Sequence, residues 1–332
     1  MTESGSPLDG VDLVLADLDG VVYTGALAIP FAVDSLNTVA RSTRVGYITN
    51  NASRTSESVA EQLSSFGLAV GADDVVTSPQ AAVRLLSGLV PAGSVILVVG
   101  GEGLLVEVER AGFVTTTSAE DAPAAVIQGF HPSVGWTQLA EAGFALHTGI
   151  PWVATNTDWT IPVARGIAPG NGTLVSAVHT AVGRLPVVAG KPETPIFEEA
   201  VRRFAGTAPL FIGDRLDTDI LGANRAGIPS VLVLTGIDTG KQVIAADAKS
   251  RPTYILEDLR QLHEPYPEVV ERTEDGATVI SVNDAVVKLA DNTVTIVSPG
   301  SRIDLLRAGC AVIWRSGRAI YGLTVPTELY AP

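Results

Sequence analysis

The chain has 332 residues, which is enough for two or three domains and a large core. Hydrophobic residues make up 46% of it and charged residues 17%, as in well-packed globular proteins and unlike disordered ones. The net charge of −14 argues against nucleic acid or an anionic membrane as a partner. An anionic substrate would therefore need positive charge placed locally in its binding site.

Three features of the sequence predict where the protein resides. The single cysteine, Cys310, excludes an internal disulfide bond and suits a reducing cytosol. The first residues, Met1–Gly5, lack the basic and apolar regions of a signal peptide. No apolar run approaches the ~18–20 residues of a membrane-spanning helix. We expect a cytoplasmic protein with no membrane partner.

Residues 1–79 alternate between strand and helix patterns. The apolar run 11–16 is a predicted buried strand, followed by helical spacing at 31–41, a strand at 45–48 and a helix at 56–66. Such alternation is typical of parallel strands joined by crossover helices. Residues 80–186 repeat it, with predicted strands at Val95–Val99, Ala125–Ile127 and Trp152–Thr155.

The same pattern returns after Lys191. A helix is predicted from Pro192 to Phe204, because proline is suited to a first helical turn. Two strands follow, at Leu210–Ile212 and Ser230–Leu234, on either side of a helix at Ile220–Ala226.

The last part of the chain has a different pattern. The Pro-rich, acidic stretch His263–Pro267 is a predicted linker. Beyond it, three β-type runs are separated by Asn-Asp and Asp-Asn pairs, and a helix followed by a strand is predicted between Arg302 and Arg315. The runs are Ala277–Val282, Ala285–Leu289 and Thr293–Val297. We therefore predict a small α+β extension over 263–332.

Four short motifs place polar side chains directly after predicted strands. They are Asp17-Leu18-Asp19-Gly20, Ile48-Thr49-Asn50-Asn51, Gly190-Lys191-Pro192 and the run from Gly213 to Asp219. Because the carboxyl ends of parallel strands meet at one edge of a sheet, we expect these side chains to gather there. Carboxylates, a hydroxyl and an ammonium group together predict a magnesium-dependent phosphoryl-transfer site.

In their order along the chain, these motifs resemble the haloacid dehalogenase (HAD) superfamily, and within it the p-nitrophenyl phosphatase/NagD-like family. The resemblance covers roughly residues 11–262. It implies an α/β fold with a Rossmann-like parallel-sheet core. Only 30 positions separate Asp19 from Thr49, but 142 separate Thr49 from Lys191, which leaves room for an inserted domain. The resemblance therefore implies an α/β cap of the C2 type at 80–186, inserted into a core formed by 1–79 and 187–262.

The resemblance also assigns roles to the residues of the core. It implies that Asp17 attacks phosphorus to form an aspartyl-phosphate, and that Asp19 acts as general acid and then as general base. The Mg²⁺ ion would be held by the side chains of Asp17 and Asp214 and by the backbone carbonyl of Asp19.

Other motif residues would bind phosphate or support the site. Thr49, the amide of Asn50 and Lys191 would bind the phosphate group, and Lys191 would also neutralise Asp17. Asp219 would orient Lys191 or a metal-bound water. In this superfamily, an acid at the position of Asp19 points to a phosphatase rather than to a dehalogenase or an ATPase.

The predicted cap contributes three candidate substrate residues. Asn156 lies in a Thr-Asn-x-Asp segment that resembles one approaching the active site in the family. Arg165 and His131 stand where this chain departs from the family pattern, so either one could contact the substrate and set specificity for it. The alternative is that these loops only pack the cap.

A complete cap favours a small phosphorylated metabolite as the substrate. Glycerol 3-phosphate or 2-phosphoglycolate is preferred here, because the cap has few aromatic residues for stacking a ring. A nucleoside monophosphate or pyridoxal phosphate is the alternative, since Trp136, Trp152 and Trp159 weaken that argument. The alternative to an enzyme is a non-catalytic module that uses the same fold for binding. A homodimer is a possible assembly state.

Overall fold

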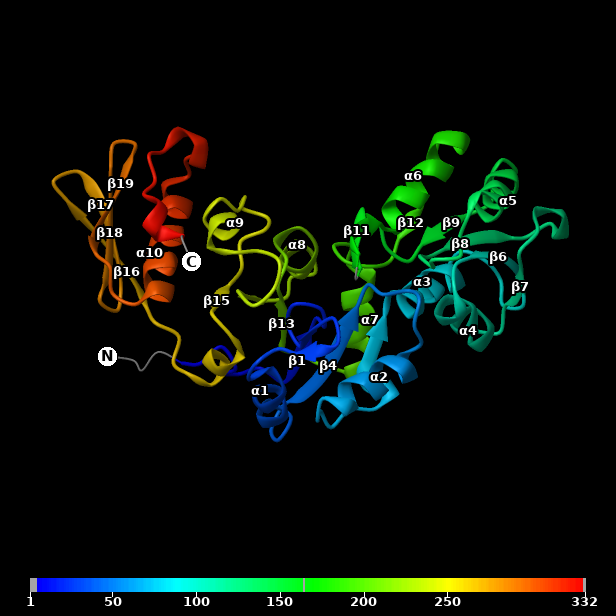
Figure 1. Cartoon of the computed structure of the whole chain (residues 1–332), viewed down its shortest axis with the longest axis horizontal. Coiled ribbons are helices and arrows are strands. Elements are labelled where there is room, and N and C mark those ends of the chain that lie inside the picture. Colours follow the sequence, from blue (N-terminus) through cyan, green and yellow to red (C-terminus); the bar gives the residue numbers. More distant parts are fainter. Residues whose placement is uncertain (1–4, 164, 331–332) are drawn as a thin grey trace. The chain divides into compact units, whose positions relative to one another are not determined.

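Residue contacts divide the chain into two units. The computed structural model describes residues 5–163 and 165–330 (Figure 1). Unit 1 contains Met1–Val45 and Thr207–Pro332, and unit 2 contains Gly46–Gly206. This division into two units rests on contacts and does not test the boundaries of core, cap and extension, which stay a prediction.

Parallel strands form the centre of unit 1. Four of them lie in the order β15-β14-β13-β1, and each adjacent pair is parallel. β1, β14 and nearly all of β13 are buried, which explains why these strands appear in the sequence as continuous apolar runs. The elements before the extension are β1 (Leu13–Ala16), β2 (Tyr23–Thr24), β3 (Leu27–Ala28), α1 (Ala32–Val39), β13 (Pro209–Gly213), the π-helical turn η3 (Leu216–Ile220), α8 (Leu221–Arg225), β14 (Ser230–Val233), α9 (Gly240–Ile244), β15 (Tyr254–Leu256) and η4 (Leu259–His263).

The C-terminal extension adds a four-stranded antiparallel sheet and one long helix to unit 1. The strands follow one another in the order β16-β17-β18-β19, and α10 packs on β17, β18 and α9. Figure 1 shows α10 between the sheet and α9. The elements are β16 (Val269–Glu274), β17 (Ala277–Val282), β18 (Ala285–Ala290), β19 (Thr293–Ser298), α10 (Arg302–Ser316), η5 (Ile320–Gly322) and η6 (Thr327–Leu329).

The extension shares one hydrophobic cluster with the parallel-strand part. Val243, Ile244 and Ile255 of that part join Ile280, Val287 and other buried residues of the extension. The three predicted β runs and the helix are confirmed. The predicted strand at the end of 302–315 is wrong, because α10 continues to Ser316. β16 was not predicted, since most of its side chains are exposed and three of its six residues are charged.

Unit 2 contains a second parallel sheet. Its five strands lie in the order β12-β9-β8-β6-β7. α5 and α6 pack together over one face, and α3 and α4 pack together over the other (Figure 1). The strands are β6 (Val95–Val99), β7 (Val114–Thr116), β8 (Ala125–Gln128), β9 (Trp152–Ala154) and β12 (Val187–Val188). The helices are α3 (Ser78–Ser87), α4 (Glu102–Arg110), α5 (Trp136–Leu146) and α6 (Asn171–Val182), and η2 is Ala119–Asp121.

The other elements of unit 2 precede this sheet in sequence, follow it or lie between β9 and β12, and the first two residues of β4 belong to unit 1. β4 pairs in parallel with β5, and β10 forms an antiparallel hairpin with β11. They are β4 (Arg44–Thr49), α2 (Ser56–Ser65), η1 (Ala72–Asp74), β5 (Val75–Thr77), β10 (Thr160–Val163), β11 (Gly166–Pro169) and α7 (Pro195–Phe204). The helix predicted from Pro192 begins at Pro195 instead, because Gly190–Glu193 form a turn closed by the Glu193 N–H on the Gly190 carbonyl.

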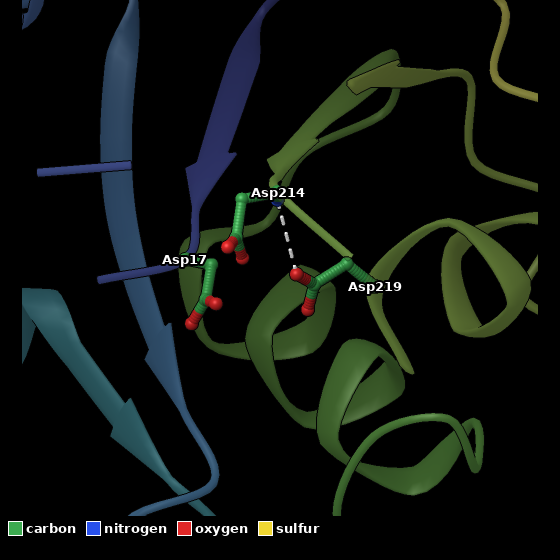
Figure 2. A group of neighbouring side chains, drawn as sticks. All are labelled: Asp17, Asp214 and Asp219. Carbon is green, nitrogen blue, oxygen red and sulfur yellow. Dashed lines mark hydrogen bonds between the residues drawn. The ribbon is translucent and has the colours of Figure 1, made fainter. Parts of the chain in front are cut away.

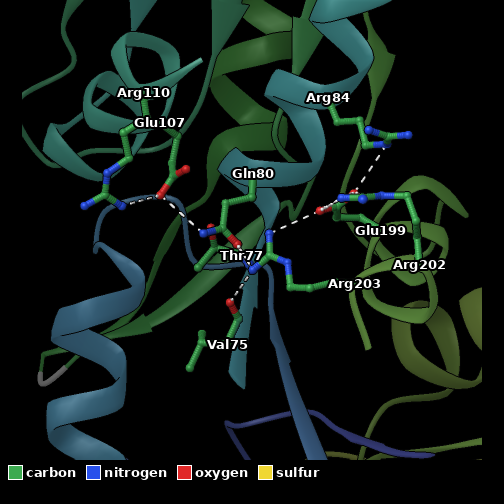
Figure 3. Close-up of polar contacts among 9 residues, drawn as sticks. All are labelled: Val75, Thr77, Gln80, Arg84, Glu107, Arg110, Glu199, Arg202 and Arg203. Carbon is green, nitrogen blue, oxygen red and sulfur yellow. Dashed lines mark hydrogen bonds and ion pairs between the residues drawn. The ribbon is translucent and has the colours of Figure 1, made fainter. Parts of the chain in front are cut away.

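A network of charges fixes α7 within unit 2 (Figure 3). The buried carboxylate of Glu199 accepts from Arg202 and Arg203 of its own helix, and pairs with Arg84 of α3. Arg203 also donates to the carbonyl of Val75 and to Gln80. Because α7 follows Lys191 closely, this network anchors the helix that begins just after the third motif.

No helix in the described part of the chain is long and apolar enough to cross a bilayer.

Candidate active site

Three buried carboxylates converge in unit 1. Asp17 directly follows β1, Asp214 directly follows β13, and Asp219 lies in the turn η3. Each offers an oxygen within 4.8 Å of the others, and Figure 2 shows the three side chains grouped together, with Asp17 and Asp214 after their strands and Asp219 on the helical segment. The adjacent parallel strands β1 and β13 bring the first and fourth motifs together, as the strand-end argument predicts.

Backbone N–H groups hold two of these carboxylates in place. The Oδ2 atom of Asp219 accepts from the N–H groups of Asp214 and Arg215, both at 3.2 Å (Figure 2). The Oδ2 atom of Asp214 accepts from the N–H of Ile237 at 2.7 Å. Such charge-assisted bonds restrict the orientation of each carboxylate.

The segment Thr235–Asp238, here called the clamp loop, surrounds Asp214. The Asp238 N–H donates to the Asp214 carbonyl at 3.1 Å, and the Asp238 side chain accepts from the N–H of Leu216 at 2.6 Å. The Thr235 hydroxyl donates to the Gly20 carbonyl at 2.7 Å. Sequence analysis did not single out this loop. Burial raises the pKa of the Asp238 carboxyl.

Two glycines leave room for the Asp214 side chain. A Cβ atom added to Gly236 would lie 2.0 Å from the Asp214 Oδ2 atom, and one added to Gly20 would lie 2.2 Å from it. Gly20 also has a φ of 80°, which favours glycine. The last residue of the first motif is therefore glycine for two independent reasons, and Gly236 is a signal by which the clamp loop could have been found in the sequence.

The carboxylate group fits a magnesium ion by its donor chemistry. Three carboxylates this close repel one another strongly unless a cation compensates them. Hard oxygen donors are the ligands that Mg²⁺ prefers, and it commonly binds through one or two carboxylates together with substrate phosphate. The predicted ligands Asp17 and Asp214 are both in this group, and Asp219 joins them. The predicted supporting role of Asp219 stays a prediction.

Asp19 is placed differently from Asp17. Its side chain is exposed in the loop after β1, and its backbone pairs with Tyr23 in an isolated bridge. Asp19 is exposed and lies two positions after the buried Asp17, which suits an acid–base group that exchanges protons with solvent. Its predicted roles, in proton transfer and as a carbonyl ligand, stay predictions.

In unit 2, the side chain of Asn50 holds both sides of the Lys191 backbone. Its Oδ1 atom accepts from the Lys191 N–H at 2.8 Å, and its Nδ2 donates to the Lys191 carbonyl at 3.0 Å. The same Nδ2 donates to Asp158 at 3.1 Å. Thr49, which is buried at the end of β4, accepts the Asn51 N–H. The second and third motifs are thus joined, and Asn50 has a positioning role that sequence analysis missed.

Asn156 extends this network. Its Nδ2 donates to the Asn50 carbonyl at 2.7 Å, and its Oδ1 accepts from the Asp158 N–H at 3.2 Å. Its own carbonyl accepts from Asn171, at the start of α6, at 2.7 Å. These contacts engage the side chain of Asn156 at both ends, so the geometry supports a positioning role. The predicted contact with substrate stays a prediction.

The two other candidate substrate residues, His131 and Arg165, lie in different loops of unit 2. The His131 ring packs against Gly101, and its Nδ1 lies 2.6 Å from the Ser133 hydroxyl. Arg165 is exposed in the turn of the β10–β11 hairpin, which sequence analysis did not predict. Neither placement tests their predicted roles.

Comparison with known proteins decides the family. A model described as haloacid dehalogenase-like hydrolase matches residues 14–114, and one described as HAD-hydrolase-like matches residues 188–262. The D-glycerol 3-phosphate phosphatase of Mycobacterium tuberculosis is 42% identical over 311 residues, which are 93% of this chain and 87% of that protein. The chain belongs to the HAD-like hydrolases.

Other relatives agree with this assignment. The crystal structure of a glycerol phosphate phosphatase from M. tuberculosis in complex with magnesium matches with a TM-score of 0.87 and 40% identity, over 95% of this chain and 94% of that one. The p-nitrophenyl phosphatase from Archaeoglobus fulgidus matches with a TM-score of 0.71 and 28% identity, over 76% and 98%. The 5'-nucleotidase YutF of Bacillus subtilis is 34% identical, over 74% and 95%. The chain is a phosphoric monoester hydrolase, and the expectation of a non-catalytic module is set aside.

Proposed function

We propose that this chain hydrolyses glycerol 3-phosphate in a magnesium-dependent reaction. The observation that carries the proposal is the extent of the likeness to the D-glycerol 3-phosphate phosphatase, which spans 93% of this chain. The likeness to the 5'-nucleotidase spans 74% of the chain but 95% of that shorter protein. Of these two relatives, the glycerol 3-phosphate phosphatase matches more of this chain, 93% against 74%. This favours its substrate over a nucleotide.

Asp17 is the proposed nucleophile. Its carboxylate oxygen forms a bond to phosphorus while the bond from phosphorus to the glycerol oxygen breaks, and Asp19 gives that oxygen a proton. Asp19 then removes a proton from water, whose oxygen bonds to phosphorus and releases phosphate from Asp17. The exposed position of Asp19 supports this exchange of protons.

Thr49, Asn50 and Lys191 are the proposed phosphate-binding residues. Lys191 supplies positive charge, which the approach of one anion to another requires in a protein of net charge −14. Asp17, Asp214 and the Asp19 carbonyl would hold Mg²⁺, which when bound neutralises charge on the transferred group. Asn156, Arg165 and His131 are the proposed contacts to the rest of the substrate.

A phosphate-release assay on a panel of substrates tests the proposal. The panel contains glycerol 3-phosphate, 2-phosphoglycolate, pyridoxal phosphate and a nucleoside monophosphate, each with Mg²⁺ and with a chelator. We expect kcat/KM for glycerol 3-phosphate to be at least ~10-fold above the others, the size that a few polar contacts supply. The Asp17→Asn protein, purified in the same way, controls for contaminating phosphatases. A higher kcat/KM for any other substrate would reject glycerol 3-phosphate, and activity in chelator would reject the metal.

We also propose a cytoplasmic location and a homodimer. The single, buried cysteine supports a reducing compartment. Sedimentation analysis of the purified protein tests the assembly state, and a mass near the 34.4 kDa of one chain would reject the dimer.

A further inference from the structure

The clamp loop is continuous with α9, the helix on which the C-terminal extension packs. Asp238 ends the loop, and α9 begins two residues later at Gly240. The Ile237 N–H of the loop donates to the Asp214 carboxylate, and the Asp238 N–H donates to the Asp214 backbone carbonyl. Any shift in the start of α9 therefore moves the donor that orients this carboxylate and the bond that fixes its backbone. The contacts that hold α9 in place therefore affect the orientation of Asp214 in the carboxylate group.

The extension contacts α9 at both of its ends. A Cβ atom on Gly240 would lie 3.3 Å from the Leu306 Cδ1 atom of α10 and 3.2 Å from the Tyr330 carbonyl. A Cβ atom on Gly309 of α10 would lie 3.3 Å from the Ile244 Cδ1 atom, at the other end of α9. Helix α9 has only five residues and cannot fix its own position, because so short a helix is marginal without packing.

The packing at the first of these contacts is not complete. A pocket opens there, and Leu234, Gly240, Leu306 and Tyr330 are among the residues that line it. Removing more side chain from this side would enlarge an existing void, and the start of α9 would then have room to move. Leu234 is the residue directly before the clamp loop, so the void borders the loop itself.

We propose that Leu306 is a positioning residue, through which the extension holds the clamp loop and thereby sets the affinity of the carboxylate group for Mg²⁺. The proposal rests on the proposed metal role of Asp17 and Asp214. The route is a chain of contacts within unit 1: Leu306 on Gly240, the backbone from Gly240 back into the clamp loop at Ile237, and the Ile237 N–H on Asp214.

A matched pair of variants tests it. Leu306→Ala removes the contact with α9. Leu289→Ala removes an equal side chain from β18, in the same hydrophobic cluster, where it lies opposite Thr278 and Val294. The two leucines are 5% and 6% exposed, so loss of burial alone affects both variants alike. The readouts are the calorimetric Kd for Mg²⁺ without substrate, Tm, and turnover at saturating Mg²⁺.

We expect Leu306→Ala to weaken Mg²⁺ binding by about 3- to 10-fold, a size typical of coupling through packed side chains, while kcat at saturating Mg²⁺ stays near the wild-type value. Leu289→Ala should lower Tm similarly and leave the Kd unchanged. A wild-type Kd in Leu306→Ala would overturn the proposal, and so would a rise in Kd of the same size in both variants. If Leu306→Ala does not fold, the smaller change Leu306→Val serves, with the same direction expected.

A double-mutant cycle tests the route. Asp238→Ala removes the hydrogen bond that fixes the clamp loop to Leu216. In this background, Leu306→Ala should weaken Mg²⁺ binding much less than it does in the wild type, because both changes release the same loop. Equal effects in the two backgrounds would overturn the route. Wild-type protein that binds no Mg²⁺ would instead reject the proposed function, and this inference with it.

Discussion

Arg307 of α10 donates two hydrogen bonds to the carbonyl oxygen of Ile255, at 3.0 Å from Nε and 2.8 Å from Nη2. The guanidinium is buried, pairs with Asp304 at 2.9 Å, and lies 4.6 Å from the centre of the Tyr266 ring. A buried charge in the extension is thus satisfied by strand β15 of the parallel sheet. The extension is therefore joined to that sheet by a specific polar contact as well as by shared apolar packing.

Removing this contact should destabilise unit 1 strongly. We expect Arg307→Ala to lower the free energy of unfolding by about 3–5 kcal/mol, because Asp304 stays buried without its partner. Arg315→Ala is the matched control on the same helix. Its ion pair with Glu271 is roughly half-exposed, and such pairs contribute about 0–1 kcal/mol. Urea unfolding of both variants measures the difference, and equal losses would contradict this interpretation of Arg307.

The stability of the protein should depend on Asp12 in a pH-dependent way. The Thr207 hydroxyl, with the N–H groups of Ala208 and Thr207, lowers the pKa of the Asp12 carboxyl below its ordinary value of 3.8. The ionised form is thus favoured by folding, so its contribution is present above pH ~4 and is lost as pH falls through the folded-state pKa. The stability difference between wild type and Asp12→Ala should be constant from pH 7 to 5 and shrink below pH 4. Thermal unfolding across this range checks it, and a difference that grew on acidification would refute it.

Asn50 should matter for turnover through the position of Lys191. Asn50→Ala removes the bonds to both sides of the Lys191 backbone, and we expect kcat to fall by about 10²-fold, as small displacements of a catalytic group can cause. Asn50→Asp keeps an acceptor for the Lys191 N–H but faces Asp158 with a second carboxylate, so it should not restore the rate. Steady-state kinetics and the Kd for Mg²⁺ separate this effect from metal loss. Wild-type kcat in Asn50→Ala would show that the lysine is held by other contacts.

Asp214 should determine the metal requirement. Asp214→Ala removes one carboxylate of the group, so we expect the Mg²⁺ concentration for half-maximal activity to rise by at least ~10-fold. Calcium should inhibit the wild type, because its six to eight ligands at longer distances do not hold the octahedral arrangement that Mg²⁺ demands. Titration of activity with each metal measures both effects. An unchanged Mg²⁺ requirement in Asp214→Ala would remove this residue from the metal site.

The parts of the structure that follow from local pattern could be predicted from the sequence. The apolar runs before Asp17 and Asp214 are buried parallel strands, and their adjacency brings the two carboxylates together. The runs of the extension are strands at the predicted places, because alternate apolar residues need one buried face.

Contacts between distant segments could not be predicted in this way. The bond from Ile237 to Asp214 involves a backbone N–H, which any residue other than proline carries, so no side chain marks it. The hydrogen bonds between Asn50 and Lys191 join residues 141 positions apart, and the sequence predicted only that the amide of Asn50 binds phosphate. The packing of Leu306 on Gly240 also depends on how α10 folds back, which local patterns do not specify.

The identity of the nucleophile is the central claim, and two substitutions bear on it. Asp17→Asn should abolish turnover, at least ~10³-fold, and leave the fold intact, since an amide cannot form the acyl-phosphate. Asp19→Asn should slow both formation and hydrolysis of the intermediate, because both steps need its proton transfer. Circular dichroism controls for the fold of each variant.

Acid quenching of the enzyme during turnover of glycerol 3-phosphate carrying labelled phosphorus tests the claim most directly. We predict that the wild type retains label on the peptide that contains Asp17, that hydroxylamine removes this label as it does from acyl-phosphates, and that Asp17→Asn retains none. Label retained by Asp17→Asn, or a label that maps to another residue, would contradict Asp17 as the nucleophile.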